Sequence, residues 1–421
     1  MKAIRMTLAE GIRLTCLPSR KFKTGILSAQ FITPLRRDTA SLGALIPSVL
    51  RRGTTKSPGM GELARRLDTL YGARIDPAVR KIGERQCAGF VASFIDEAFT
   101  PGNEKLLEPV VDLISELLLD PATWHGRFQP AWFESEKANL MDAVRGMIND
   151  KREWAGYRLL SEMCRREPYG VPRLGDEKSV SRLGPVRTFR RYRDLLASGR
   201  MEWIYCGSAE PERVRDLLRS ALIAMPRENM AALPSMARHR PRRQVREVTD
   251  HMDVTQGKLG MGFACAGDDV TAFLMGNMIF GGGSNSKLFL NVREKLSLCY
   301  YASSIFHRQK RLMTVSSGIE FENYERTRDE ILKQLKAVQD GKIEDWEFEA
   351  ARSALLHAYA SMGDAQSRLE NFYLNQAVLD LNETPEELAE NVKNITPERV
   401  QEAMSGVNLD TIYFLRDNEN E

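Results

Sequence analysis

Apolar residues along this chain follow two periods, one typical of β-strands and one typical of helices. Alternating and then continuous apolar runs predict strands over residues 23–35, 87–96 and 201–208. Apolar residues three or four positions apart predict helices over residues 40–54 and 104–120. The order lacks a regular βαβ alternation. It therefore favours an α+β fold, with a mostly antiparallel sheet and helices packed on one face.

The second half of the chain repeats this order of elements. A strand is predicted over residues 257–267, a helix running into glycines over 268–283, and a helix leading into a strand over 284–304. Such a recurrence indicates two homologous domains, and a stretch rich in proline and arginine lies between them. We predict an N-terminal domain over residues 1–225, a linker over 226–247 and a C-terminal domain over 248–421.

Composition and charge exclude several classes of function. The chain of 421 residues carries 60 basic and 57 acidic side chains, so its net charge of +3 gives no general reason to expect a nucleic-acid partner. The basic run over residues 238–243 has no interleaved aromatic residues, which favours a solvated linker over a nucleic-acid patch. We find neither a secretory signal nor an apolar stretch of membrane-spanning length, and expect a cytoplasmic protein without a membrane partner. The six scattered cysteines are expected to be reduced and mostly buried.

Three stretches, taken in order, resemble the pitrilysin or insulinase family of zinc metallopeptidases. They are residues 48–76 (SVLRRGTTKSPGMGELARRLDTLYGARID), 169–183 (YGVPRLGDEKSVSRL) and 281–304 (GGGSNSKLFLNVREKLSLCYYASS). The chain looks most like the bacterial YmfF-like group of that family, and also like the non-catalytic subunit of mitochondrial processing peptidase. This resemblance implies two LuxS/processing-peptidase-like α+β domains.

The resemblance also implies where a zinc site would stand in this chain. Family members carry H-x-x-E-H on a helix, where two histidines bind zinc and the glutamate acts as general base. Anchored on Gly53, these positions fall here on Ala44, Pro47 and Ser48, and the third zinc ligand falls on Ala143, within one or two positions. The chain has five histidines, and none stands three to five residues from another. We therefore expect no zinc on this chain, and expect the metal on a partner chain.

The same resemblance nominates two residues of the C-terminal half for substrate binding. Family members place an arginine and a tyrosine seven positions apart beside the substrate, and Arg293 and Tyr300 match them. Arg293 would donate to peptide carbonyls or a carboxylate, and Tyr300 to a developing oxyanion. A surface ion pair and a packed tyrosine are the structural alternatives. The glycine-rich run over residues 281–288 lacks the spacing of a phosphate-binding loop, so a turn between helices is favoured.

These observations lead to a functional hypothesis with two alternatives. The chain is predicted to be the non-catalytic subunit of a heterodimeric zinc peptidase, inactive on its own, with a homologous zinc-bearing chain and a peptide as its partners. The first alternative is a stand-alone peptide-binding or escort module without peptidase activity. The second is an independent enzyme, for which Cys299 is the one plausible nucleophile in the C-terminal block.

Overall fold

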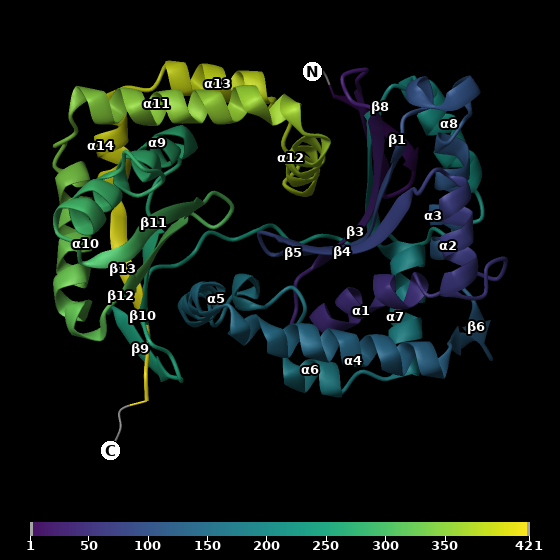
Figure 1. Ribbon diagram of the computed structural model, residues 1–421, viewed down its shortest axis with the longest axis horizontal. Helices are drawn as coiled ribbons and strands as arrows, with labels where there is room; N and C mark the ends of the chain where they lie inside the picture. The colour runs from purple at the N-terminus through teal and green to yellow at the C-terminus, as the bar shows by residue number, and fades with distance from the viewer. Residues whose placement is uncertain (1–2, 419–421) are drawn as a thin grey trace. The chain divides into compact units, whose positions relative to one another are not determined.

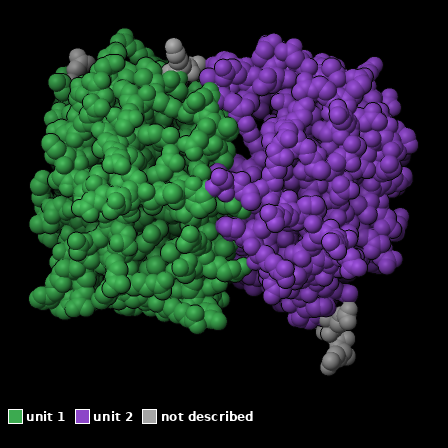
Figure 2. Space-filling model, turned by 180° about the vertical axis from the view of Figure 1, so that it is seen from behind, with its two compact units in different colours: residues 1–145, 171–234, 362–382 green, residues 146–170, 235–361, 383–421 purple. Residues whose placement is uncertain are grey.

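The computed structural model describes residues 3–418, which form two compact units. Unit 1 comprises Met1–Arg145, Val171–Pro234 and Met362–Asn382, and unit 2 comprises Gly146–Gly170, Ser235–Ser361 and Glu383–Glu421 (Figure 2). Each unit therefore takes one segment from the opposite half of the sequence. The units depart from the predicted division at residues 146–170 and 362–382, which cross from one half to the other.

Unit 1 is built on a six-stranded sheet in which only β2 and β8 run parallel. Its strand order is β1 (Ile4–Ala9), β2 (Ile12–Pro18), β8 (Arg200–Gly207), β3 (Thr24–Pro34), β5 (Arg85–Ile95), β4 (Arg74–Ile82). A large apolar core fills the space between this sheet and the helices that cover it. The helices of unit 1 are α1 (Ala40–Leu50), α2 (Met60–Thr69), α3 (Leu107–Leu119), α4 (Pro130–Gly146), α6 (Glu177–Ser181), α7 (Pro185–Ser198), α8 (Pro211–Ala221) and α12 (Gln366–Val378), with a small β6 (Thr123–Trp124) and β7 (Arg127–Phe128) ribbon.

Unit 2 has a five-stranded sheet with its own apolar core. Its order is β11 (Cys299–His307), β12 (Leu312–Ile319), β10 (Gly257–Cys265), β13 (Val407–Arg416), β9 (Arg246–His251), and the β13–β9 pair is parallel (Figure 1). Its helices are α5 (Lys151–Met163), α9 (Val270–Phe280), the π-helix η5 (Leu288–Lys295), α10 (Tyr324–Gln339), α11 (Asp345–Ala360), α13 (Pro385–Lys393) and α14 (Pro397–Ser405).

The two sheets share one topology. Read from β4, the order β4-β5-β3-β8-β2 in unit 1 corresponds to β11-β12-β10-β13-β9 in unit 2, and the parallel pair falls at the same place. The predicted α+β fold is confirmed, and the predicted repeat of elements is seen as a repeat of strand order. None of the described helices is both long and apolar enough to cross a bilayer.

The sequence predicted helices on one face of each sheet, but in the structure one helix also packs on the second face of each sheet. In unit 2 this helix is α5, whose Leu159 and Met163 lie over strand glycines. A Cβ built on Gly260 would come within 3.2 Å of Leu159, and one on Gly262 within 2.6 Å of Met163. Glycine in a strand interior weakens the strand, and here it allows the helix to approach closely.

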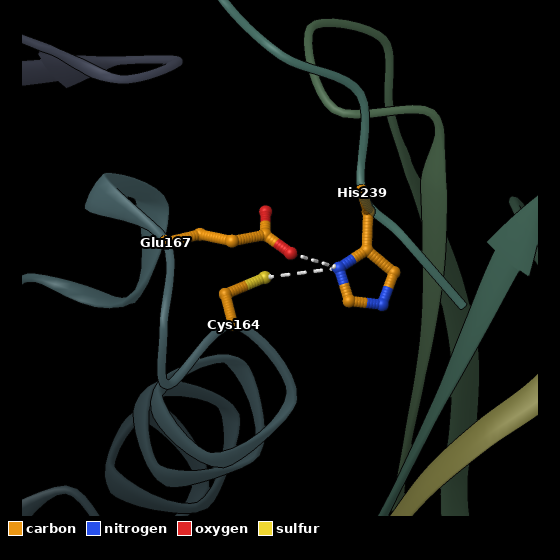
Figure 3. A group of neighbouring side chains, drawn as sticks. All are labelled: Cys164, Glu167 and His239. Carbon is orange, nitrogen blue, oxygen red and sulfur yellow. Dashed lines mark hydrogen bonds and ion pairs between the residues drawn. The ribbon is translucent and has the colours of Figure 1, made fainter. Parts of the chain in front are cut away.

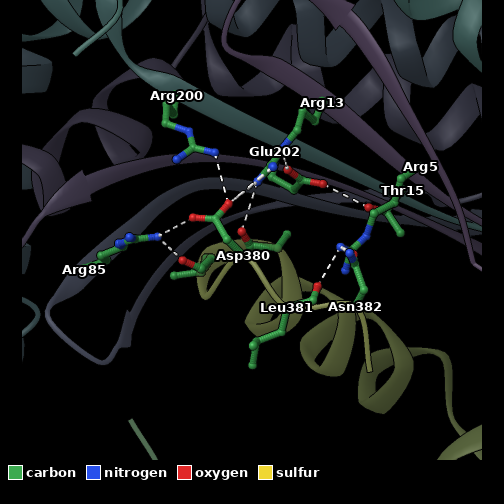
Figure 4. A network of polar contacts seen from close by, with 11 residues as sticks. Arg5, Arg13, Thr15, Arg85, Arg200, Glu202, Asp380, Leu381 and Asn382 are labelled. Carbon is green, nitrogen blue, oxygen red and sulfur yellow. Dashed lines mark hydrogen bonds and ion pairs between the residues drawn. The ribbon is translucent and has the colours of Figure 1, made fainter. Parts of the chain in front are cut away.

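In unit 1 the added helix is α12, which lies on a polar face of the sheet. The Gln366 side chain donates to the Cys206 carbonyl at 3.0 Å, and Arg80 pairs with the buried Glu370 at 2.7 Å. At the end of α12, the backbone carbonyls of Ala377 and Val378 accept from Arg13 and Arg85. Figure 4 shows arginines gathered around Asp380, which follows this helix. Cations suit a helix C-terminus, because its last carbonyls are otherwise unpaired and carry partial negative charge.

The predicted linker is exposed along most of its length but is held at two points. Residues 226–234 belong to unit 1, where Arg227 donates to the carbonyls of Leu196 and Gly199 at 2.7 Å. Residues 235–247 belong to unit 2, where His239 is buried. The segment is therefore fastened to each unit rather than solvated throughout.

Candidate substrate-binding hollow and the altered zinc helix

Helix α1 carries the three positions at which the family resemblance expects zinc chemistry. Ten of its eleven residues are buried, and only Ser48 is half-exposed. Pro47 lies inside the helix, where it cannot donate a backbone hydrogen bond. The helix nevertheless continues, because the Arg51 N–H donates to the Pro47 carbonyl at 3.0 Å.

The side chains at these positions do not suit a zinc ion. Ala44 and Pro47 offer no ligand atom, whereas zinc in proteins is held by cysteine, histidine and carboxylate side chains. Ala143 lies on α4, which an ion pair between Arg52 and Glu136 ties to the end of α1 at 3.0 Å. The two helices on which the resemblance expects the three zinc ligands and the general base thus lie together in unit 1, but these positions carry none of those four residues. The assignment of these positions as a degenerate zinc site stays a prediction.

The helix that carries Arg293 is a π-helix, η5, with a wider turn than an α-helix. A buried ion pair holds its start, where Lys287 Nζ lies 2.9 and 2.7 Å from the two carboxylate oxygens of Glu347. Ser297 adopts a positive φ of 49° just after the helix, where the chain turns into β11. The lysine of the glycine-rich run, Lys287, is thus already paired with Glu347, which disfavours a role in binding phosphate.

Arg293 and Tyr300 line one hollow of about 430 Å³ in unit 2. Tyr300 is the bulged residue of β11, because the register to β12 shifts between Cys299 and Tyr301. A bulge redirects a side chain at the end of a strand, and Tyr300 is 58% exposed. Tyr301 is not among the lining residues and packs instead under the guanidinium of Arg152, 4.1 Å from the ring centre.

The Tyr300 hydroxyl already has an acceptor in this hollow. It donates to the Glu320 carboxylate, and this hydrogen bond raises the pKa of Tyr300. The phenol therefore stays protonated at neutral pH and remains a donor. A peptide carbonyl that used this donor would take the place of Glu320.

The Arg293 side chain, which lines the same hollow as Tyr300, makes only weak contacts. Its guanidinium lies 4.7 Å from the centre of the Phe289 ring, and its Nε lies 3.5 Å from Glu294. Exposed pairs of this kind contribute at most about 1 kcal/mol. Arg293 can therefore turn toward a ligand at little cost.

Cys299 lines the same hollow but is poorly suited to act as a nucleophile. Burial raises the pKa of its thiol. The reactive form of cysteine is the thiolate, so a raised pKa lowers reactivity. This disfavours the hypothesis of an independent cysteine-dependent enzyme.

Two further lining residues, Glu320 and Asn323, were missed by sequence reasoning. They follow β12 and lie beside Tyr300 because β12 pairs with β11, with Cys299 opposite Ile319. The acidic residue at the end of a strand was visible in the sequence, but the strand pairing that brings it to Tyr300 was not.

These are the features expected of a metallopeptidase homologue without its zinc-binding side chains, and comparison with known proteins shows the class of inactive metallopeptidase homologues. Residues 190–355 match the family model described as "Peptidase M16 inactive domain". Over 413 residues the chain is 30% identical to the Bacillus subtilis (strain 168) protein named "Probable inactive metalloprotease YmfF", and the match covers 97% of this chain and 96% of that protein. The chain therefore belongs to the peptidase M16 family, which is the pitrilysin or insulinase family expected from the sequence.

Solved structures show the same fold over the full length. A conserved protein from Enterococcus faecalis V583 is 27% identical, with a TM-score of 0.89, and the match covers 100% of this chain and 99% of that one. A peptidase M16 inactive domain from Pseudomonas fluorescens is 16% identical, with a TM-score of 0.80 and full coverage of both chains. The second likeness supports the fold alone.

Proposed function

We propose that this chain is the non-catalytic subunit of a two-chain zinc peptidase and acts in the cytoplasm. One observation carries the proposal: α1 lacks the zinc ligands, while Arg293 and Tyr300 line a common hollow. The two residues that the resemblance assigns to substrate binding thus lie at one accessible place, which supports a peptide-binding role. The zinc, and the water it activates, would belong to a homologous partner chain.

In the proposed complex this chain binds and orients the peptide. Arg293 donates to peptide carbonyls, and Tyr300 donates to the carbonyl oxygen as negative charge develops on it. In this step the Tyr300 hydroxyl donates to the substrate oxygen in place of Glu320. The new hydrogen bond strengthens as the reaction proceeds, because the substrate oxygen becomes more negative. A positioned donor of this type is typically worth about 10²–10³ in rate.

The test compares peptide cleavage by the zinc-bearing homologue alone and mixed with this chain. We expect cleavage to require both chains, and the complex to bury more than about 1,200 Å² as stable complexes do. Tyr300→Phe in this chain should lower kcat by about 10²–10³ without preventing assembly. Equal cleavage with and without this chain would contradict the proposal.

Tyr71→Phe is a matched control. Tyr71 lies in a turn after α2 and itself adopts a positive φ of 57°. Its side chain is 41% exposed, and its hydroxyl donates to the Glu104 carboxylate at 2.9 Å. It lies in unit 1, outside the hollow, so its loss should leave kcat unchanged. If this chain alone binds peptide and no zinc-bearing partner assembles with it, the stand-alone peptide-binding module replaces the two-chain peptidase.

A further inference from the structure

A cluster of buried polar side chains in unit 2 lies outside the hollow and has no part in the proposed function. Cys164, Glu167 and His239 each present one donor atom, and the three atoms lie within 4.8 Å of one another (Figure 3). Cys164 is fully buried and His239 is 7% exposed. The donors are a sulfur, a carboxylate oxygen and an imidazole nitrogen, the set from which proteins build zinc sites.

Two segments, distant in the sequence, bring these atoms together. Cys164 ends α5, and Glu167 follows it in a tight turn closed by a hydrogen bond from the Glu167 N–H to the Cys164 carbonyl at 2.9 Å. His239 belongs to the irregular segment before β9, where its N–H donates to the Lys310 carbonyl at 2.9 Å. The backbone therefore fixes all three side chains before any ligand is considered.

The two distances to His239 Nδ1 can be compared with those around a single small ion. Bonds of about 2.0–2.3 Å in a tetrahedral arrangement place ligand atoms about 3.3–3.6 Å apart. The Cys164 sulfur lies 3.8 Å from His239 Nδ1, close to this spacing. Glu167 Oε1 lies 2.7 Å from the same nitrogen as an ion pair, so the carboxylate would move by roughly 0.6 Å to share an ion with it.

The surroundings of the three donors are those that support metal ligands. His239 Nε2 faces Asp410 Oδ2 at 3.3 Å, and Asp410 is itself held by the Arg242 N–H at 2.8 Å. A carboxylate on the far ring nitrogen fixes the tautomer and leaves Nδ1 free to bind a metal. Lys310 pairs with the other Glu167 oxygen, Oε2, at 2.7 Å, which leaves Oε1 as the ligand atom.

We propose that Cys164, Glu167 and His239 form a structural site for a divalent cation of the zinc type. The ion would replace two protons, one on His239 Nδ1 facing Glu167 and one on the Cys164 thiol, both of which leave to solvent, and it would fasten the segment around His239 to the end of α5. It is separate from the catalytic zinc expected on a partner chain, and it lies in a different unit from α1. The alternative is a purely ionic cluster without metal, and the experiment separates the two.

The experiment titrates the full chain, purified in the presence of a chelator and then freed of it, with Zn²⁺ and with Co²⁺. We expect one ion per chain, a higher melting temperature with Zn²⁺, and a thiolate-to-cobalt charge-transfer band with Co²⁺. Cys164→Ser should abolish the band and His239→Gln should weaken binding at least tenfold. Cys265→Ser and His357→Gln, which alter a buried cysteine and an exposed histidine outside the cluster, should change neither.

The wild-type measurement alone can overturn the proposal, even if a variant fails to fold. Absence of stoichiometric binding, or Co²⁺ binding without a thiolate band, leaves an ionic cluster and no metal site. Binding that survives both Cys164→Ser and His239→Gln assigns the ion to another place and equally refutes this site.

Discussion

The buried ion pair between Lys287 and Glu347 links the stability of unit 2 to the helix that carries Arg293. Lys287 is 7% exposed and Glu347 5%, and the ammonium contacts both carboxylate oxygens. Lys287→Met removes the cation and leaves a carboxylate with little access to water. Breaking a buried pair in this way typically costs about 3–5 kcal/mol. Glu347 keeps one other contact, the hydrogen bond from the Glu344 N–H at 3.0 Å, which does not neutralise its charge.

Urea unfolding followed by fluorescence and circular dichroism measures this cost. With a slope of about 3 kcal/mol per molar urea, the midpoint should fall by roughly 1–1.7 M. Lys287→Met combined with Glu347→Leu removes both charges and should recover most of the loss, because two apolar side chains can replace a buried pair. Lys333→Met, which removes a solvent-exposed lysine from its helical pair with Glu330, should cost less than about 1 kcal/mol.

The reasoning fails if Lys287→Met costs no more than Lys333→Met, or if the double variant is less stable than either single one. In the first case the pair would be solvated in solution. In the second, the ion pair would be worth more than an apolar replacement. A consequence for function also follows: Lys287→Met should weaken peptide binding through displacement of η5, although Lys287 is not among the residues that line the hollow.

Three other predictions concern stability. Gly262→Val should destabilise unit 2 by about 1–3 kcal/mol in thermal unfolding, because its Cβ would lie 2.6 Å from the Met163 sulfur. Gly61→Ala, whose Cβ meets nothing within 4 Å in α2, should stabilise by up to about 1 kcal/mol. Burial alone would raise the pKa of Glu116, but hydrogen bonds from Arg66 and Lys56 lower it. The ionised Glu116 carboxylate therefore stabilises the folded state above its unfolded pKa of about 4.5, and this stabilisation is lost as pH falls through the lowered pKa of the folded state. We expect Glu116→Gln to lower the free energy of unfolding at pH 7 and to leave it unchanged near pH 2.

The sequence predicted the elements of the fold well, because their signals are local. The apolar run of β3 and the apolar stripe of α3 depend only on residues within each element. The family resemblance placed the predicted zinc-site positions on α1 through a short anchor, Gly53, without any knowledge of packing. It nominated Arg293 and Tyr300 by a fixed spacing of seven residues, which here runs from a π-helix into a bulged strand.

What the sequence did not indicate depends on pairing between distant residues. Glu320 meets Tyr300 only through the register of β11 and β12, and Cys164 meets His239 across 75 positions of the chain. A search for two histidines in one helical turn could not detect a donor set that mixes sulfur, oxygen and nitrogen from two distant segments. Spacing rules can nominate sites whose residues lie close together in the sequence, but they miss sites assembled from distant segments.

The placement of α5 and α12 also depends on contacts between residues distant in the sequence. It bears on the proposed function. Each helix comes from one half of the sequence and packs on the sheet that the other half builds, so neither half contains all of its own unit. A fragment that ends in the predicted linker would expose the polar face that α12 covers, including the buried Glu202. The hollow proposed to bind peptide lies entirely in unit 2, yet unit 2 includes α5 from the first half. Peptide binding by this chain is therefore expected to require the whole sequence, even though Arg293 and Tyr300 stand only seven residues apart.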